Sequence, residues 1–208
     1  MITYGEFKTL VLQHLDMHTV AGEEVPLDYN NQEDFVRRIP SLTNIALRSI
    51  ATTACPIQET ISLSSPGYGS ISAMPGGWSK VTMPADYWRI RGNGIGILGE
   101  NGIVASGAYK FLNNREILVR TSEIPNMVIT YDRYPRKVAG VDDETLDCDD
   151  SVAYCASFYV AAELMRTEDA YSYQSLFNEY QDRLNQLVRP VYAEFVRTES
   201  CYDVGSPY

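Results

Sequence analysis

One segment in the C-terminal third is apolar on every side of the helix that it should form. Residues Val152 to Ala162 read VAYCASFYVAA and include no charged side chain. A helix of this composition has no polar face to offer to water, so it must be buried all round. The run is too short to cross a bilayer, which takes about 20 residues. A small helical domain rarely supplies so much cover, so another subunit is expected to contribute, with Tyr154 and Phe158 as candidate contacts.

Helix signals also occupy the N-terminal quarter. The spacing of apolar residues predicts one helix from Tyr4 to Met17 and a second that ends near Thr53. Asn30 or Asn31 is expected to cap the second helix, because a short polar side chain can accept a free backbone N–H there. Pro40 lies inside this helix and predicts a kink or a short break.

A second pair of helices is predicted after residue 147. The acidic run 147–150 can cap the apolar helix and suits its positive N-terminal end, and this helix should end near Arg166. A stripe of apolar residues predicts a fourth helix from Tyr171 to Phe195. Val196 to Tyr208 has no helical pattern and is expected to be an extended arm.

Between the helical pairs, glycine and proline punctuate short β-prone runs. These runs are ETISL, GSISA, SKVTM, WRIRG, REILVR and MVITYDRY. They predict a small antiparallel sheet or barrel of five to seven strands. The expected class is therefore α+β: a mainly α-helical bundle of about four helices with an inserted antiparallel β-sheet or barrel. The expected parts are a bundle from residues 1–55 and 139–195, a β-rich insertion at 56–138 and an extended C-terminal arm at 196–208.

Charge is unevenly spread along the chain, whose formal net charge is −10. Residues 1–54 carry −3, residues 55–140 carry +3 and residues 141–208 carry −10. An acidic chain does not bind nucleic acid by neutralising phosphates, which needs clustered Lys and Arg. Strand alternation would place Arg89 and Arg91 on one face of the insertion. One interpretation is that this face is simply solvated. The other is that it binds the acidic C-terminal third of a neighbouring copy, because oppositely charged regions on one chain suit head-to-tail contacts between copies.

The residues that could carry chemistry do not form a catalytic pattern. The four cysteines form no C-x-x-C pair, and they are expected to be buried or free thiols in a reducing compartment. Cys155 lies in the apolar helix, which favours packing. His14 and His18 are spaced as a helix pair and are predicted to lie at the surface, without the further ligand that a metal site needs. No G-x-S-x-G sequence occurs, so no catalytic residue is assigned.

Two further motifs are better explained by structure than by binding. Gly94 to Gly99 matches G-x-G-x-x-G, but no helix pattern follows, so a glycine-rich β loop is predicted in place of a cofactor site. The acidic cluster at 142–150 lacks the ligand order of a calcium loop and is predicted to be a solvated loop. No cofactor and no metal are assigned. The N-terminal MITYGEFKTL lacks the pattern of a signal peptide, and no membrane association is expected.

Four stretches, taken in order, are similar to a known family. They are IPSLTNIALRSI, VTMPADYWRIR, ITYDRYPRKV and the segment LDCDDSVAYCASFYVAAELMRTEDAYSYQSLFNEYQDRLNQL. Their order resembles the head-to-tail adaptor proteins of tailed bacteriophages, the group that includes tail tubular protein A. The likeness covers about residues 31–190. The glycine-rich stretch at 92–107 and both ends of the chain depart from the family pattern.

The resemblance implies a structural protein of the virion neck, made in the host cytoplasm. Such adaptors form a ring, usually a dodecamer, that binds the portal, extends the DNA channel and supports the tail or nozzle proteins. Double-stranded DNA passes through without specific binding. The resemblance implies portal contact for Tyr192, Phe195, Tyr202 and Tyr208. It implies contact with neighbouring copies or the tail for Trp78, Tyr87 and Trp88.

Two alternative functions stay open from the sequence. One is another phage neck or tail assembly protein, such as a tail terminator or a minor capsid protein. The other is a ligand-binding module whose site is the aromatic β insertion. A ring protein would form large particles, alone or with portal, whereas a ligand module would be a stable monomer whose melting temperature shifts with small molecules.

Overall fold

The fold is α+β and divides into two compact units. Unit 1 comprises Met1–Cys55 and Pro135–Tyr208, and unit 2 comprises Pro56–Tyr134. The structure is a computed structural model that describes residues 1–16, 29–64, 70–99, 102–106 and 109–199. Within the elements, the side chains at 29–32, 70, 91–93, 99, 102–106 and 189–199 are not described.

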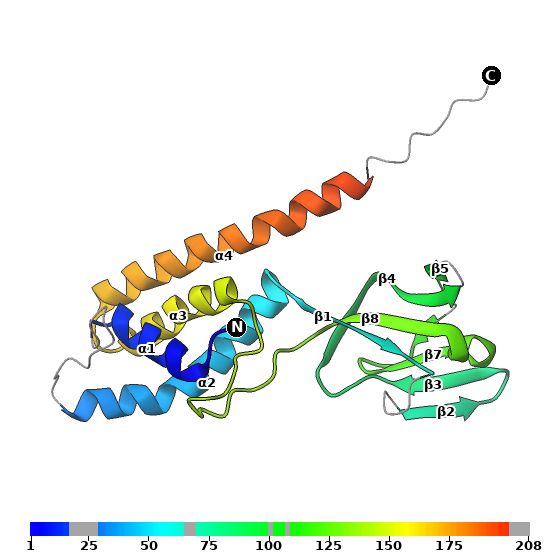
Figure 1. The fold of residues 1–208 in the computed structure, drawn as a ribbon, viewed down its shortest axis with the longest axis horizontal. Coiled ribbons are helices and arrows are strands. Elements are labelled where there is room, and N and C mark those ends of the chain that lie inside the picture. Colours follow the sequence, from blue (N-terminus) through cyan, green and yellow to red (C-terminus); the bar gives the residue numbers. More distant parts are fainter. Residues whose placement is uncertain (17–28, 65–69, 100–101, 107–108, 200–208) are drawn as a thin grey trace, which may run out of the picture. The chain divides into compact units, whose positions relative to one another are not determined.

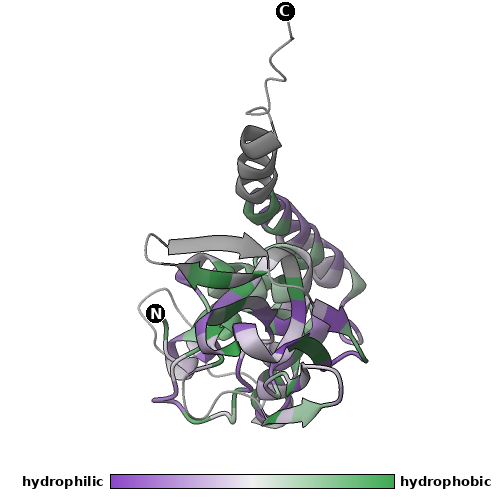
Figure 2. Ribbon diagram, turned by 90° about the vertical axis from the view of Figure 1, so that its right-hand side faces the viewer, coloured by the Kyte–Doolittle hydropathy of each residue, from purple (hydrophilic) through white to green (hydrophobic). Residues whose placement is uncertain are grey.

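Unit 1 is helical, with α3 at its centre. Its helices are α1 (Tyr4–His14), α2 (Tyr29–Thr53), α3 (Asp150–Met165) and α4 (Ala170–Glu199). Helix α3 contacts each of the other three and lies between α4 and α2 (Figure 1). Helix α4 packs Leu176, Phe177 and Tyr180 against this core. Hydrophilic residues lie between its apolar ones, as expected for a helix that packs on one side (Figure 2).

The cover of α3 comes from its own chain. From Val152 to Leu164 its side chains are buried except at Tyr154, Tyr159 and Glu163. The expectation that a second subunit must complete this cover is therefore wrong. Four positions of the helix are alanine, which lets neighbouring helices approach closely, and α1, α2 and α4 together surround it.

The acidic loop before α3 is exposed at most of its side chains, Asp142 and Asp143 among them, as predicted, and its backbone is tied to the start of α1. Thr3 and Glu6 form a capping box at the N-terminus of α1. The next free N–H groups of that helix, from Tyr4 and Gly5, donate to the carbonyls of Glu144 (2.7 Å) and Asp142 (3.0 Å). The loop thus completes the hydrogen bonding of the helix end.

Carboxylates in the same loop accept backbone N–H groups instead of capping α3. Glu144 accepts the N–H groups of Ala139 (2.8 Å) and Gly140 (3.3 Å). Asp147 accepts the N–H of Arg136 at 2.8 Å. Asp149 occupies the N-cap position of α3, but its side chain makes no capping hydrogen bond. The expected carboxylate cap is therefore absent at that residue.

Several helix ends differ from the sequence expectations. Helix α2 begins at Tyr29, so the expected caps Asn30 and Asn31 lie within its first turn, and their side chains lie outside the described part of the chain. Pro40 does not break the helix, and Phe35, Ile39 and Thr43, on the turns before and after it, are all buried. Helix α1 ends at His14, and α4 continues to Glu199, beyond the expected end at Phe195. Residues 200–208 of the expected arm lie outside the described residues.

Unit 2 is built from two antiparallel sheets. The strands are β1 (Ile57–Ser62), β2 (Ser70–Met74), β3 (Trp78–Thr82), β4 (Tyr87–Gly99), β5 (Gly102–Ser106), β6 (Tyr109–Phe111), β7 (Glu116–Arg120) and β8 (Met127–Arg133), with a 3-10 helix at Thr121–Asn126. The strand orders are β1-β8-β4-β5 and β2-β3-β7-β6. Side chains from both sheets, such as Ile129 and Val119, form one apolar core. The described residues form eight strands, more than expected, and no closed barrel.

The glycine-rich motif lies within a strand, so the prediction of a loop is wrong. Gly94 to Gly99 forms the second half of β4, which pairs with β8 on one side and β5 on the other. The register shifts between Ile90 and Ile95 and again between Ile97 and Leu98. Glycine is common at such bulges because it tolerates the local bend. Ile95 reaches the core and is 1% exposed.

Gly140 offers a test of how tightly the loop packs on α2. Its φ is +92°, and an added Cβ would lie 3.1 Å from Cγ of Pro40. We expect Gly140→Ala to lower the free energy of unfolding by about 2 kcal/mol, from backbone strain and this contact together. In a Pro40→Ala background the loss should fall to about 1 kcal/mol. Urea denaturation of the four proteins measures this coupling, and equal losses in both backgrounds would contradict the contact.

Candidate interaction surfaces

The sheet β2-β3-β7-β6 has one face on the core and one face in solvent. Strand alternation sends Ser79, Val81, Ile117 and Val119 inward, where they are buried. Cross-strand register places the opposite side chains together, with Trp78 beside Arg120 and Lys80 beside Leu118. We define the outer face by the residues Met74, Trp78, Lys80, Lys110, Glu116, Leu118 and Arg120.

Trp78 is the centre of the outer face. The guanidinium of Arg120 lies 4.5 Å from its ring centroid, and the ammonium of Lys110 lies 5.6 Å away. Both positions fit cation–π contacts. Met74, 42% exposed, is the cross-strand partner of Trp78. A tryptophan held between cations beside a methionine is a composition typical of protein contact surfaces.

The outer face carries a positive surplus. Lys80 pairs with Glu116 at 2.8 Å, and Asn113 donates to the same carboxylate at 2.7 Å. These hydrogen bonds, the one from Lys80 above all, lower the pKa of Glu116 and keep it ionised. In the described part of the chain, neither Lys110 nor Arg120 has an ion-pair partner. Three cations and one carboxylate therefore face solvent here.

The second aromatic cluster of unit 2 holds two strands together. The guanidinium of Arg89 lies 4.0 Å from the ring of Trp88, and its Nε donates to Oδ2 of Asp132 at 2.8 Å. Asp132 is buried, and the ring of Tyr134 lies 6.2 Å from that of Trp88. Burial of the carboxylate makes this pairing a structural contact between β4 and β8.

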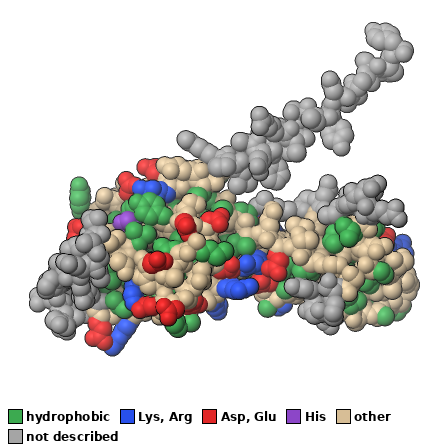
Figure 3. All heavy atoms as spheres, viewed as in Figure 1, with side chains coloured by type: hydrophobic (Ala, Val, Ile, Leu, Met, Phe, Trp, Pro, Cys, Tyr) green, Lys and Arg blue, Asp and Glu red, His purple; other side chains and the backbone are tan. Residues whose placement is uncertain are grey.

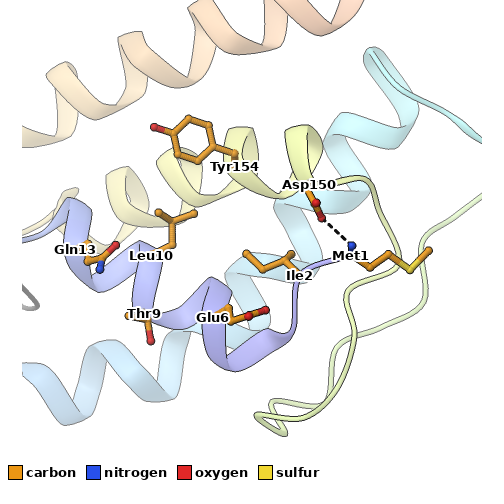
Figure 4. Close-up of a pocket in the computed structure, with 8 residues that line it drawn as sticks. All are labelled: Met1, Ile2, Glu6, Thr9, Leu10, Gln13, Asp150 and Tyr154. Atoms are coloured by element: carbon orange, nitrogen blue, oxygen red, sulfur yellow. Dashed lines mark ion pairs between the residues drawn. The ribbon is translucent and has the colours of Figure 1, made fainter. Parts of the chain in front are cut away.

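In unit 1 a groove of about 700 Å³ runs between α1 and the start of α3 (Figure 4). It is lined by Met1, Ile2, Glu6, Thr9, Leu10, Gln13, Asp150 and Tyr154. The lining combines apolar side chains with two carboxylates and includes no cation side chain, imidazole or thiol. Asp150 forms an ion pair with the amino group of Met1 at 3.1 Å.

His14 is half-buried, whereas the sequence predicts a surface position. Its ring stacks on Phe158 with centroids 4.0 Å apart, and its Nε2 lies 3.0 Å from Oγ of Ser157. The guanidinium of Arg183 lies 4.7 Å from the same Phe158 ring. Burial, with a smaller contribution from Arg183, lowers the pKa of His14 to about 4. His18, its expected partner, lies outside the described residues.

The residues predicted to make contacts fall into three groups. Trp78, Trp88, Arg89 and Tyr154 reach the surface. Tyr87 and Phe158 are each 7% exposed and pack in their own cores, which removes them from a contact surface. The side chains of Arg91, Tyr192, Phe195, Tyr202 and Tyr208 lie outside the described part of the chain.

Sequence reasoning missed Met74, Glu116 and Leu118 of the outer face, and it treated Lys80, Lys110 and Arg120 only as part of the positive charge of the β insertion. The alternation of REILVR could have placed Arg120 on the face opposite the buried residues. Its position beside Trp78 depends on the pairing of β3 with β7, which are far apart in sequence. No local signal in the sequence gives that pairing.

The described thiols and acids do not form a reactive or metal-binding site. Burial raises the pKa of Cys148 to about 12 and of Cys155 to about 11, so both stay protonated. Cys55 is also free and has a raised pKa from burial. Within the described ranges, no group of three or more His, Cys, Asp or Glu side chains is placed to hold a metal ion. No described helix is long and apolar enough to span a membrane.

Comparison with known proteins does not assign a family. No protein-family model matches this chain, and no curated protein matches it at a significant level.

Proposed function

We propose that this chain is a structural virion protein, a head-to-tail adaptor that forms a ring, dodecameric by resemblance, between the portal and the tail of a bacteriophage. The ring would extend the DNA channel and present a platform for tail proteins. The observation that carries the proposal is the outer face. There the half-buried Trp78 lies between two cations that have no ion-pair partner among the described residues. Such a surface is suited to binding an acidic protein partner.

The segments that resemble phage adaptors also meet in the fold. VTMPADYWRIR covers the end of β3, a turn and the start of β4, and ITYDRYPRKV covers β8 and the chain's exit from unit 2. Tyr87 pairs with Arg133 in the β4–β8 ladder, and the carbonyl of Asp86 accepts the N–H of Tyr134 at 2.7 Å. The two segments thus contact each other in the folded chain. This contact supports the use of their order in the sequence as an argument for the resemblance.

The charge distribution fits contacts between copies. Unit 2 has a formal charge of +1, and the remainder of the chain has −11. On the face drawn in Figure 3, carboxylates lie among apolar side chains over the helices of unit 1. An acidic helical unit in one copy and a cationic outer face in the next would attract each other. The acidic surplus would also keep passing DNA from being gripped.

The test is co-sedimentation with the portal protein encoded in the same genome. The wild-type chain should sediment with portal as a ring visible by negative-stain electron microscopy. Trp78→Ala should weaken docking or ring formation about tenfold or more, because large aromatic anchors dominate interface energies. Tyr171→Ala, which removes an 84% exposed aromatic from unit 1, is the matched control and should bind like wild type.

Other outcomes would replace the proposal. Binding to tail proteins without binding to portal would favour a tail terminator. A ligand-binding module would be favoured if the chain is a monomer that binds neither portal nor tail proteins. Its melting temperature should then rise with oligosaccharides in the wild type and not in Trp78→Ala. A Trp78→Ala variant that docks at full strength would show that the outer face is not the contact surface.

A further inference from the structure

The sheet that carries the outer face has two open edges. Its order is β2-β3-β7-β6, so β2 and β6 are the outermost strands. In the part of the chain that the structure describes, no strand pairs with the outer edge of either one. Figure 1 shows β2, β3 and β7 side by side, with β2 outermost. An outermost strand presents unpaired N–H and C=O groups that can pair with another chain.

The β2 edge lacks the usual protection against pairing. Its sequence, SISAM, contains no charged residue and no proline. Every described side chain of the strand is exposed, including Ile71 at 40% and Met74 at 42%. Proteins that must keep an edge free place lysine, proline or a bulge there. An uncharged, apolar edge strand is therefore suited to a contact.

The β6 edge also exposes apolar side chains. Phe111 is 55% exposed, and Leu112, which follows the strand, is 47% exposed. The one charged residue of this strand, Lys110, extends back over its own sheet to the ring of Trp78. Its charge is thus held away from the open edge and does not protect it.

We infer that β2 of one copy pairs with β6 of the next, which joins the sheets of neighbouring copies edge to edge. This inference rests on the proposed function, because a ring needs a contact between two different surfaces of the same chain. All three ladders within the sheet are antiparallel. In four alternating strands β2 and β6 run in opposite directions, so a repeated sheet would continue as antiparallel pairing.

The faces of the two edge strands also match. Ile71 is the register partner of Val81, and Phe111 is the register partner of Ile117, and both partners are buried on the core side. Ile71 and Phe111 therefore lie on the same side of the sheet. In the joined sheet they would become neighbours across the new strand pair and bury each other's exposed surface. Symmetric pairing of β2 with β2 would leave Phe111 and Leu112 exposed.

The experiment uses two charged variants of the full chain, Ile71→Lys and Phe111→Lys. Each blocks one edge and leaves the other intact. Sedimentation velocity, with and without portal as a template, should show that each variant alone associates with its own kind about tenfold or more weakly than wild type. Mixed together, the two should form a discrete heterodimer, because the intact β6 of one fits the intact β2 of the other. Circular dichroism melts confirm folding, and Leu98→Lys, on the other sheet, should assemble like wild type.

The outcomes separate this inference from the proposed function. Heterodimers without portal binding would support edge pairing and overturn the adaptor role. Rings on portal that both variants join like wild type would overturn edge pairing and leave the adaptor role standing. If Phe111→Lys still associates with itself and Ile71→Lys does not, the pairing of β2 with β6 would be overturned in favour of symmetric β2–β2 contacts. A wild-type chain that associates neither alone nor on portal would overturn both.

Discussion

Replacing Leu164 with alanine should lower the free energy of unfolding by about 2–5 kcal/mol, and by the same amount at every protein concentration. Leu164 is fully buried in α3, at 0% exposure, so the truncation leaves a cavity among the helices of unit 1. Those neighbouring helices belong to the same chain. The loss should therefore not depend on association. Urea denaturation followed by far-UV circular dichroism, at two concentrations a hundredfold apart, measures it.

The matched control for Leu164 is Tyr171→Ala, which should change stability by less than about 0.5 kcal/mol because the side chain is exposed. A loss at Leu164 that grows or shrinks with concentration would show that another copy covers α3, since association links stability to concentration. That result would contradict the burial of α3 by helices of its own chain.

Acidification should destabilise unit 1 through His14. The pKa of His14 is about 4 in the folded chain, against about 6.5 for an unfolded histidine. Between these values the unfolded chain binds the proton and the folded chain does not, so stability falls as pH falls. The contribution is complete above pH 6.5 and is lost as pH drops towards 4, by about 1–2 kcal/mol once solvent screening of the half-buried ring is allowed for.

The comparison protein for this prediction is His14→Phe, which keeps a ring against Phe158 and removes the titrating group. Carboxylates titrate in both proteins, so the difference between their stability–pH curves isolates His14. Urea denaturation from pH 7 to pH 4 should show the wild type losing more stability than the variant. Parallel curves, or an NMR titration of His14 with a midpoint near 6.5, would contradict its burial.

Elements with strong local signals could be predicted from sequence. Helix α2 ends at Thr53, as its apolar spacing indicates, and α3 begins at Asp150, the last residue of the acidic run. The run MVITYDRY forms β8. By contrast, the glycines of β4 indicate a loop, and only pairing with both β8 and β5 keeps them in a strand. Local propensity does not contain such long-range contacts.

The apolar surface of α3 shows a second limit of sequence reasoning. Its composition correctly predicts burial on nearly all sides, but it does not say which elements provide the cover. Helix α1 comes from one end of the chain and α4 from the other, and both pack on α3 together with α2. His14 is half-buried by the same arrangement, through its contact with Phe158. Only the three-dimensional packing gives this histidine its aromatic contact.

The candidate surface was partly predictable. Trp78 stands out in the sequence as a tryptophan in a strand-like run. Its neighbours Lys110 and Arg120 come from strands 32 and 42 residues further along the chain and reach it only through sheet order. The open edges of β2 and β6 likewise depend on that order.

Mass measurement of the particle formed with purified portal tests the central claim most directly. Native mass spectrometry should find many copies of this chain on each portal ring, in a number set by rotational symmetry, as a closed adaptor ring requires. Portal that binds only a single copy, or none at any concentration, would contradict the account.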